Sequence, residues 1–248
     1  MKIDALNNYL NTLLQPEHFS DFCPNGLQVE GKQEINKIVT GVTASYDLLE
    51  AALQANADAV LVHHGYFWRG EAVPITGIKK RRIQFLLKHD INLFAYHLPL
   101  DMHLEFGNNV MLAKQLGLQV TNWAGEKNML ALAELNQPQT LQSFALMLEN
   151  KLKRTPQVIG NLNKSIKRIA LCTGAAQGYI EQAVTAGADV YISGEISEQT
   201  VHVARESGMS YISAGHHATE RYGIQALGEH LEQKFGLAHQ FIDINNPV

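Results

Sequence analysis

A strand–helix–strand unit occurs twice in this chain, and this duplication constrains the fold more than any other feature of the sequence. When Ile38 is set against Ile169, the segments Lys37–His64 and Arg168–Glu195 share a glutamate and several alanines in their helical parts. Both segments also carry an Ala-Asp pair directly before their second apolar run. Strands that alternate with helices of this length are typical of a parallel or mostly parallel α/β sheet.

The duplication predicts two related α/β domains, each with a mostly parallel sheet flanked by helices. The 248 residues are enough to bury two cores of this kind. The stretch from Thr121 to Pro138 is less periodic than its surroundings and is the best candidate for the boundary. We expect a first domain at residues 1–125 and a second at residues 126–248, with the C-terminal segment able to pack back onto the first.

The second strand of the first copy ends at two adjacent histidines. The apolar run Ala57–Val62 has the character of a strand buried on both faces, and His63, His64 and Gly65 follow it at once. In open α/β sheets, ligands bind at the carboxyl ends of the strands. Neighbouring strand side chains point to opposite faces, so we expect a bend here that Gly65 permits. The equivalent strand end of the second copy carries Glu195.

A third strand in each copy adds a histidine and a carboxylate. We set His97, which precedes Asp101, against His216, which precedes Glu220 with the same spacing. At this spacing on a helix, both side chains lie on one face within reach of one ion. The apolar pattern after His216 predicts a helix there, whereas Pro99 favours a turn after His97.

Histidines and carboxylates at adjacent strand ends are typical ligands of borderline divalent metals. The candidates are His63, His64, His97, Asp101, Glu195, His216 and Glu220. One such histidine alone is more often a core or capping residue, but their recurrence at equivalent strand ends favours a metal site. The set exceeds what one tetrahedral ion needs, which favours two ions bridged by a carboxylate and a water. Zinc, iron, manganese and nickel all accept these ligands, so the metal is not identified.

Composition gives no support to several other classes of function. The net charge of −4 gives no overall attraction to nucleic acid or to an anionic membrane. The N-terminus lacks the apolar core of a signal peptide, and no stretch is long enough to span a bilayer. Without an export signal, Cys23 and Cys172 are expected to be reduced thiols. We therefore expect a cytoplasmic protein with no membrane association.

Two further segments allow more than one interpretation. The basic run Lys79–Arg82 could bind phosphates or nucleic acid, but a solvated helix face is the simpler interpretation. The aromatic run Tyr66–Trp68 follows the histidine-bearing strand end directly. It could stack on a base or a sugar, or it could pack in the core or at a subunit interface, and the sequence does not decide between these.

Five motifs, taken in order along the whole chain, resemble those of the GTP cyclohydrolase 1 type 2 family, also called the Nif-three-like family. They are Pro24–Gly31, Val62–Gly65, His97–Asp101, Ser193–Glu195 and Gly215–Glu220. The resemblance is strongest for the short bacterial members, because longer members carry an inserted domain that this length excludes. It implies two α/β domains with the functional site between them.

The resemblance also implies a site and an assembly. The ligands of a two-metal centre would be His63, His64, Asp101, His216 and Glu220. Either Asp101 or Glu220 would be the bridging ligand. His97 would lie beside the centre as an orienting or proton-transfer residue, and Glu195 would lie just beyond the ligands. The family resemblance further implies a ring-shaped homohexamer whose metal centres face an internal cavity.

Our preferred hypothesis is a metal-dependent hydrolase that acts on a small, nucleotide-like molecule. A metal-activated water would attack a carbon or phosphorus atom while His97 transfers the proton. The family label points to hydrolytic opening of a guanine ring. The alternative is a non-catalytic metal-binding scaffold or regulatory protein, since ligands alone do not reveal an open coordination position. A third hypothesis, contact of the ring with nucleic acid, would require Lys79–Arg82 to line that ring.

Overall fold

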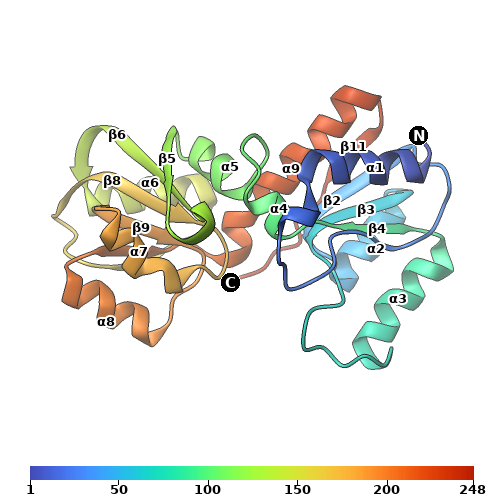
Figure 1. The fold of residues 1–248 in the computed structure, drawn as a ribbon, viewed down its shortest axis with the longest axis horizontal. Coiled ribbons are helices and arrows are strands. Elements are labelled where there is room, and N and C mark those ends of the chain that lie inside the picture. Colours follow the sequence, from blue (N-terminus) through green and yellow to red (C-terminus); the bar gives the residue numbers. More distant parts are fainter. The chain divides into compact units, whose positions relative to one another are not determined.

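The computed structural model describes residues 1–248 and divides them into two compact units. Unit 1 comprises Met1–Gly107 and Gly223–Asn245, and unit 2 comprises Asn108–Tyr222 and Asn246–Val248. Each unit contains one sheet flanked by helices, which confirms the predicted α/β class (Figure 1). Unit 1 ends earlier than the expected boundary after residue 125, because the strand that follows it belongs to the second sheet.

The sheet of unit 1 has five strands in the order β1-β4-β3-β2-β11. Their bounds are Gly26–Val29 for β1, Lys37–Thr43 for β2, Ala59–His64 for β3, Asn92–Ala95 for β4 and Ala238–Phe241 for β11. All neighbours are parallel except β1, which pairs with β4 in the antiparallel sense. The segment Gly223–Asn245 belongs to this unit because β11 extends the sheet beside β2.

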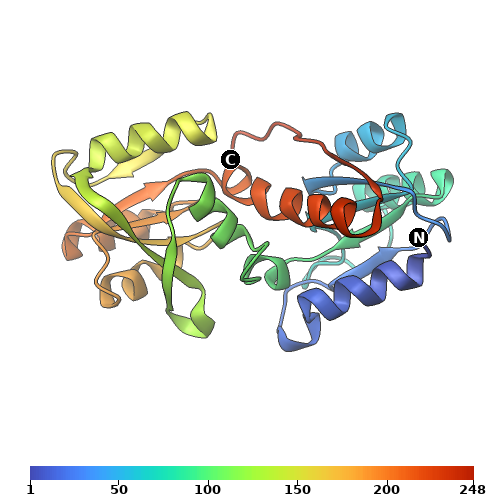
Figure 2. The ribbon, with the colours of Figure 1, turned by 90° about the horizontal axis from the view of Figure 1, so that it is seen from above.

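Helices cover both faces of this sheet (Figures 1 and 2). Their bounds are Ile3–Leu14 for α1, Tyr46–Gln54 for α2, Gly77–His89 for α3, Leu98–Asp101 for the short α4 and His216–Phe235 for α9. The short turn η1 spans Pro16–His18. In β3, Ala59 and Leu61 pack towards α1 and α9, whereas Val60 and Val62 pack towards α2 and α3. The apolar run of β3 is continuous because both faces are buried.

The sheet of unit 2 has six strands in the order β5-β6-β8-β9-β10-β7. Their bounds are Val120–Ala124 for β5, Leu130–Thr140 for β6, Gln157–Ile159 for β7, Ser165–Cys172 for β8, Val190–Ser193 for β9 and Ser210–Ser213 for β10. β8, β9 and β10 are parallel, and the other three strands join in the antiparallel sense.

The helices of unit 2 also cover two faces. Their bounds are Asn108–Gln115 for α5, Leu141–Leu152 for α6, Ile180–Thr185 for α7 and Glu198–Ser207 for α8, with short turns η2 at Glu126–Asn128 and η3 at Gln177–Tyr179. α5 and α6 pack on one face of the sheet, and α7 and α8 pack on the other. Each unit is therefore a three-layer α/β structure.

The predicted duplication has a counterpart in the strand pairing. Ile38 of β2 pairs with Ala59, and the matching residue of β8, Ile169, pairs with Val190 in the same register. The aspartate of the Ala-Asp pair also makes the same backbone contacts in both copies. Asp58 Oδ2 accepts the backbone N–H groups of Asn36 and Lys37 at 2.9 and 3.1 Å.

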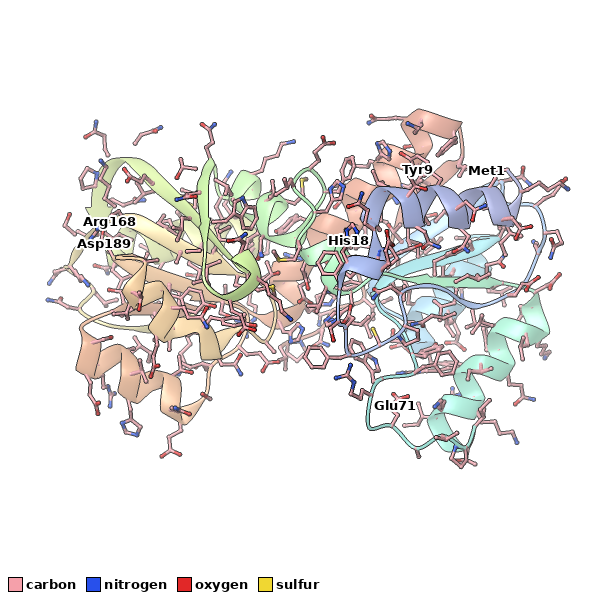
Figure 3. The ribbon with its side chains drawn as sticks, in the orientation of Figure 1. Met1, Tyr9, His18, Glu71, Arg168 and Asp189 are labelled. Atoms are coloured by element: carbon pink, nitrogen blue, oxygen red, sulfur yellow. The ribbon has the colours of Figure 1, made fainter.

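The second copy repeats this contact. Asp189 Oδ2 accepts the backbone N–H groups of Lys167 and Arg168 at 2.9 and 2.7 Å, and Arg168 Nη2 lies 3.3 Å from Asp189 Oδ1 (Figure 3). In each unit, this carboxylate fixes the start of one strand against the start of its parallel neighbour. Backbone donors at that point must be satisfied, which explains why the aspartate recurs in both copies.

The alignment of the third strand pair is wrong by one residue. Asn92 pairs with Ala59, and Ser210 pairs with Val190, so strand register sets Ala95 against Ser213. His97 therefore corresponds to the glycine before His216 rather than to His216 itself. The histidine follows one residue later in the second copy, as the first residue of α9, whereas His97 precedes the first residue of α4.

Candidate metal centre

The two adjacent histidines lie at the carboxyl end of β3. Their ring centroids are 4.5 Å apart, and pairing with β2 continues to His64, which lies opposite Thr43. His63 Nδ1 lies 3.0 Å from the carbonyl oxygen of Tyr96, and His64 Nδ1 lies 3.1 Å from Thr43 Oγ1. Metal-binding histidines are commonly anchored through one ring nitrogen so that the other can coordinate. On both rings, Nε2 is therefore the nitrogen suited to a metal.

Gly65 has a different role from the one we expected. Its φ is not in the left-handed region, so it is not needed to permit an unusual bend. A Cβ atom at this position would lie 2.2 Å from Gln28 Oε1 and 2.5 Å from Ala95 Cβ. That same Gln28 oxygen accepts the backbone N–H of Tyr66 at 2.7 Å. Glycine is required because the chain beyond the histidines passes close to β1 and β4.

Asp101 supplies a carboxylate beside the same strand end. It is the last residue of α4, a single helical turn. Pro99 lies in the first part of this turn, where proline is tolerated. Asp101 Oδ1 lies 3.5 Å from His63 Nε2. Unit 1 thus places an imidazole nitrogen and a carboxylate oxygen side by side, both of them largely buried.

His97 contacts a carboxylate that we did not identify from the sequence. His97 Nδ1 lies 2.7 Å from Asp21 Oδ1, whose side chain is only 3% exposed. Asp21 also accepts the backbone N–H groups of Phe22 and Leu98 at 2.6 and 2.9 Å, and the Asn25 amide at 2.9 Å. Both carboxylate oxygens are engaged, so Asp21 is suited to orienting His97 rather than to binding a metal.

The charge state of Asp21 agrees with this role. Burial alone would raise its pKa, but the hydrogen bonds from His97 and Asn25, the charge interaction with His97 and the Phe22 N–H lower the pKa to about 2. The carboxylate is therefore ionised at neutral pH and favours a proton on His97 Nδ1. His97 Nε2 is then the nitrogen that can accept a proton or a metal. The ligand atoms of His63, His64 and His97 all lie within 4.8 Å of one another.

Cys23 lies close to the same pair, with its sulfur within 4.8 Å of the ligand atoms of Asp21 and His97. Burial of the thiol, together with the negative charge of Asp21, raises its pKa to about 12. Only a thiolate is a good metal ligand or nucleophile, so Cys23 stays a protonated, packed thiol at neutral pH. Both cysteines of the chain are buried.

Unit 2 carries the second group of candidate ligands, at the start of α9. Its spacing of one helical turn brings His216 Nε2 to 3.1 Å from Glu220 Oε2, as the helical pattern predicts. His216 Nδ1 lies 2.7 Å from Glu195 Oε1 at the end of the β9 segment. Burial would lower the pKa of His216, but its hydrogen bonds and charge interactions with Glu220 and Glu195 raise the pKa to about 9. The same negative surroundings favour a divalent cation at Nε2.

Gly174, which follows β8, makes room for this pair and was not identified from the sequence. Its φ is +68°, and a Cβ there would lie 2.1 Å from Glu220 Oε1 and 3.3 Å from His216 Nε2. Its carbonyl oxygen accepts the backbone N–H of Glu195 at 3.2 Å. In the duplication, Gly174 matches Thr43, the residue that contacts His64 in unit 1. That correspondence was the one signal available in the sequence.

The basic run of α3 is engaged in packing. Arg81 lies 3.7 Å from the centre of the Tyr46 ring, Lys79 lies 5.2 Å from that of Phe67, and Arg82 lies 5.9 Å from that of Tyr66. Cations over aromatic faces stabilise the fold locally. These contacts favour the interpretation of a structured, solvated helix face over that of a nucleic-acid site.

The donor atoms fit a divalent metal in both units. Unit 1 presents His63, His64 and Asp101, and unit 2 presents His216 and Glu220, so every donor is an imidazole nitrogen or a carboxylate oxygen. The anchored Nδ1 atoms agree with this fit.

None of the helices combines the length and the apolar character that crossing a membrane requires.

Fold and donor groups together define a duplicated α/β protein with candidate ligands for a divalent metal. The chain belongs to the family described as Duf34/NIF3 (NGG1p interacting factor 3), whose model matches residues 1–247. This confirms the family resemblance found in the sequence motifs.

Known relatives match along nearly their whole length. A protein of Pseudomonas aeruginosa named "GTP cyclohydrolase 1 type 2 homolog" is 53% identical over 238 residues, which cover 95% of this chain and 94% of the relative. Among solved structures, the protein ybgI is 48% identical with a TM-score of 0.96, and both chains are covered completely. TTHA1606 from Thermus thermophilus is 35% identical with a TM-score of 0.89, again with complete coverage of both chains.

Proposed function

We propose that the protein is a dinuclear-metal hydrolase that acts on a small, nucleotide-like substrate. The observation that carries this proposal is the common anchoring of four histidines at strand or helix ends: each has its Nδ1 beside a protein oxygen. We propose that one centre is held by ligands from both units, namely His63, His64, Asp101, His216 and Glu220. Asp101 or Glu220 would bridge the two ions.

Bound metal supplies the chemistry that these residues lack. Two bound divalent ions would supply an activated water near neutral pH and would stabilise the charge that develops on the reacting oxygens. The chain's own residues would orient the histidines and transfer the proton. Asp21 holds the proton of His97 on Nδ1, which leaves Nε2 to accept a proton from the nucleophile and to return it to the leaving group. Glu195 holds His216 in the corresponding orientation.

The name of the relatives supports a substrate class. "GTP cyclohydrolase 1 type 2 homolog" is the name of proteins that match this chain over nearly its whole length. We therefore propose a purine nucleotide, or a molecule of similar size and charge, and a hydrolytic step at a ring carbon or a phosphorus atom.

Metal analysis of the purified protein and of the variant His63→Ala tests the proposal. We expect two ions per chain in the wild type and a clear loss in His63→Ala. His18→Ala is the matched control, because His18 is an exposed histidine on η1 (Figure 3). Unchanged metal content in His63→Ala would remove the proposed centre. Incubating the metal-loaded protein with a panel of nucleotides and phosphoesters at several pH values then tests the hydrolase.

A non-catalytic metal scaffold is the second candidate function. The burial of Asp101 and Glu220 favours it, since structural metal sites are closed by protein ligands and catalytic sites keep an open position. X-ray absorption spectroscopy of the metal-loaded protein separates the two. A solvent ligand on the metal supports the hydrolase, and complete coordination by side chains supports the scaffold.

We also propose that the chain assembles into a cytoplasmic homohexamer, as the family resemblance implies. Exposed aliphatic side chains on α3 and the loop before it support self-association. They are Val73, Ile75, Ile78 and Leu87. Light scattering coupled to size-exclusion chromatography tests the assembly, which requires the mass of six chains.

A further inference from the structure

Two segments that are far apart in the sequence meet beside His97 in unit 1. The backbone N–H of Arg69 donates to the carbonyl of Phe22 over 2.7 Å, and Arg69 Nη2 donates to the carbonyl of Asp21 over 2.7 Å. The Arg69 guanidinium lies 5.7 Å from the centre of the Phe22 ring. These contacts hold the loop after β3 against the segment before β1.

The three aromatic residues of the loop after β3 have different surroundings. Tyr66 is buried, and its hydroxyl donates to the carbonyl of Ala44 over 2.9 Å. Phe67 packs against the core between the sheet and helices α2 and α3. Both rings are therefore packing residues, which is one of the two interpretations that the sequence allowed for this run.

Trp68 lies among the histidines instead. Its indole Nε1 donates to the carbonyl of Gly65 over 3.1 Å, which fixes the ring. The ring centroid lies 5.0 Å from that of His97 and 5.9 Å from that of His64. Of the three rings, only that of Trp68 is placed where the other interpretation of the run, ligand contact, could apply.

The backbone is strained at Phe67, directly before Trp68. Phe67 has a φ of +65°, which is an outlier for a bulky side chain. Such strain persists only where the surroundings enforce it, and it is concentrated at ligand sites and active sites. Here it accompanies a change of direction between neighbours, because Phe67 packs in the core while Trp68 contacts the histidines.

Phe22 and Arg69 are exposed side chains on the same side of unit 1 as Trp68, and both could contact a ligand. Phe22 is 54% exposed, although its ring centroid lies only 6.4 Å from that of His97. Arg69 is also exposed, and the partner of its Nη2 is a carbonyl oxygen rather than a carboxylate. Exposed aromatic faces stack on planar rings. A guanidinium group binds phosphate or carboxylate groups through paired hydrogen bonds.

We propose that Phe22, Trp68 and Arg69 form a binding site, here called the aromatic site, for a planar ring that carries a phosphate or carboxylate group. The aromatic site rests on the proposed function, because it would hold the substrate ring directly beside His64 and His97. The ring would stack against Phe22 or Trp68, and its anionic group would bind Arg69. A purine nucleotide and an aromatic carboxylate both have this chemistry.

Fluorescence of Trp68 provides a direct test. The chain has two tryptophans, so the variant Trp123→Phe leaves Trp68 as the single reporter. The full-length protein is titrated with guanosine monophosphate, with nicotinate, and with ribose 5-phosphate, which has the anion but no aromatic ring. We expect saturable quenching by one or both ring-bearing probes, and binding of ribose 5-phosphate at least about tenfold weaker, as expected when one stacking contact is missing. The tighter of the two ring-bearing probes shows whether the aromatic site prefers a purine nucleotide or an aromatic carboxylate.

Two pairs of variants locate the binding. Phe22→Leu keeps an apolar side chain but removes the ring, and it should weaken binding about tenfold. Phe235→Leu is its control, because Phe235 is also partly exposed and packs on Tyr9. Arg69→Gln should weaken binding of the anionic probes. Arg81→Gln, which removes a guanidinium stacked on Tyr46 instead, should leave it unchanged.

Equal affinities of Phe22→Leu and Phe235→Leu would overturn the proposal, and so would the absence of saturable quenching by both ring-bearing probes. The same titrations with His63→Ala separate the aromatic site from the metal centre. Binding that survives there, with the same loss on Phe22→Leu, supports the aromatic site whatever the outcome for metal. A protein that binds the probes and metal but hydrolyses nothing contradicts the hydrolase alone.

Discussion

At the scale of single residues, Gly174 decides whether His216 and Glu220 can lie together. Gly174→Ala adds a Cβ that would lie 2.1 Å from Glu220 Oε1, so the carboxylate must move. We expect a metal affinity at least about tenfold lower, which corresponds to about 1.4 kcal/mol. Backbone strain at φ +68° should also lower the free energy of unfolding by about 1–2 kcal/mol. Calorimetric titration with metal and denaturant unfolding measure the two effects.

Gly208→Ala is a control for the backbone term. Gly208 has a φ of +71°, almost the same as that of Gly174, but a Cβ there would meet nothing within 4 Å. We expect both variants to lose similar stability and only Gly174→Ala to lose metal affinity. If the two variants bound metal equally well, Gly174 would have no role in shaping the site.

The residues that line the candidate site differ in how far the sequence could predict them. His63, His64 and His216 follow apolar runs, so their positions at strand or helix ends could be predicted from local pattern. The position of Asp21 could not be predicted, because Asp21 and His97 are 76 residues apart in the sequence and no periodic pattern relates them. The partner of His63 Nδ1 is a backbone carbonyl, which any residue type could supply.

At the scale of secondary structure, the repeated aspartate ties the start of one strand to the next. Burial would raise the pKa of Asp58, but hydrogen bonds from Lys32, Asn36 and Lys37 and the charge of Lys32 lower it below the ordinary 3.8. A lowered folded-state pKa means that the carboxylate stabilises the fold fully above pH 3.8 and loses this effect as the pH falls further. The pKa of Asp189 is lowered in the same way.

Asp58→Asn should therefore destabilise the protein in a pH-dependent manner. We expect a loss of about 2 kcal/mol in the free energy of unfolding at pH 7, because a charged acceptor of backbone N–H groups is removed. The difference from wild type should shrink as the pH falls below 3.8. Denaturant unfolding at several pH values measures it, with Asp47→Asn, at an exposed position in the first turn of α2, as the control. A difference that stays constant with pH would contradict the role of the charge.

The elements themselves were largely predictable, and their exact register was not. Buried strands and amphipathic helices repeat with a fixed period, so the strand–helix–strand units are evident in the sequence. The third strand was misaligned by one residue because both copies place a histidine near the strand end. Only the hydrogen-bonded pairs of Asn92 and Ser210 reveal that His97 precedes its helix whereas His216 begins one.

At the scale of the whole molecule, one metal centre shared by both units and two separate sites predict different results when two ligands are substituted together. His64 belongs to unit 1 and Glu220 to unit 2. If each unit bound its own ion, the losses of binding free energy in His64→Ala and Glu220→Gln would add in the double variant. If both residues hold one centre, the second substitution acts on a site that the first has already weakened.

A double-mutant cycle on metal binding distinguishes the two arrangements. We expect the double variant to lose less binding free energy than the sum of the single variants, with an interaction energy of about 0.5–3 kcal/mol. Calorimetric titration of the wild type, both single variants and the double variant measures it. Glu198→Gln, at an exposed residue of α8, replaces Glu220→Gln in a control cycle that should show no interaction energy. Additive losses in the first cycle would instead mean that each unit binds metal separately, and the proposed bridging carboxylate would be excluded.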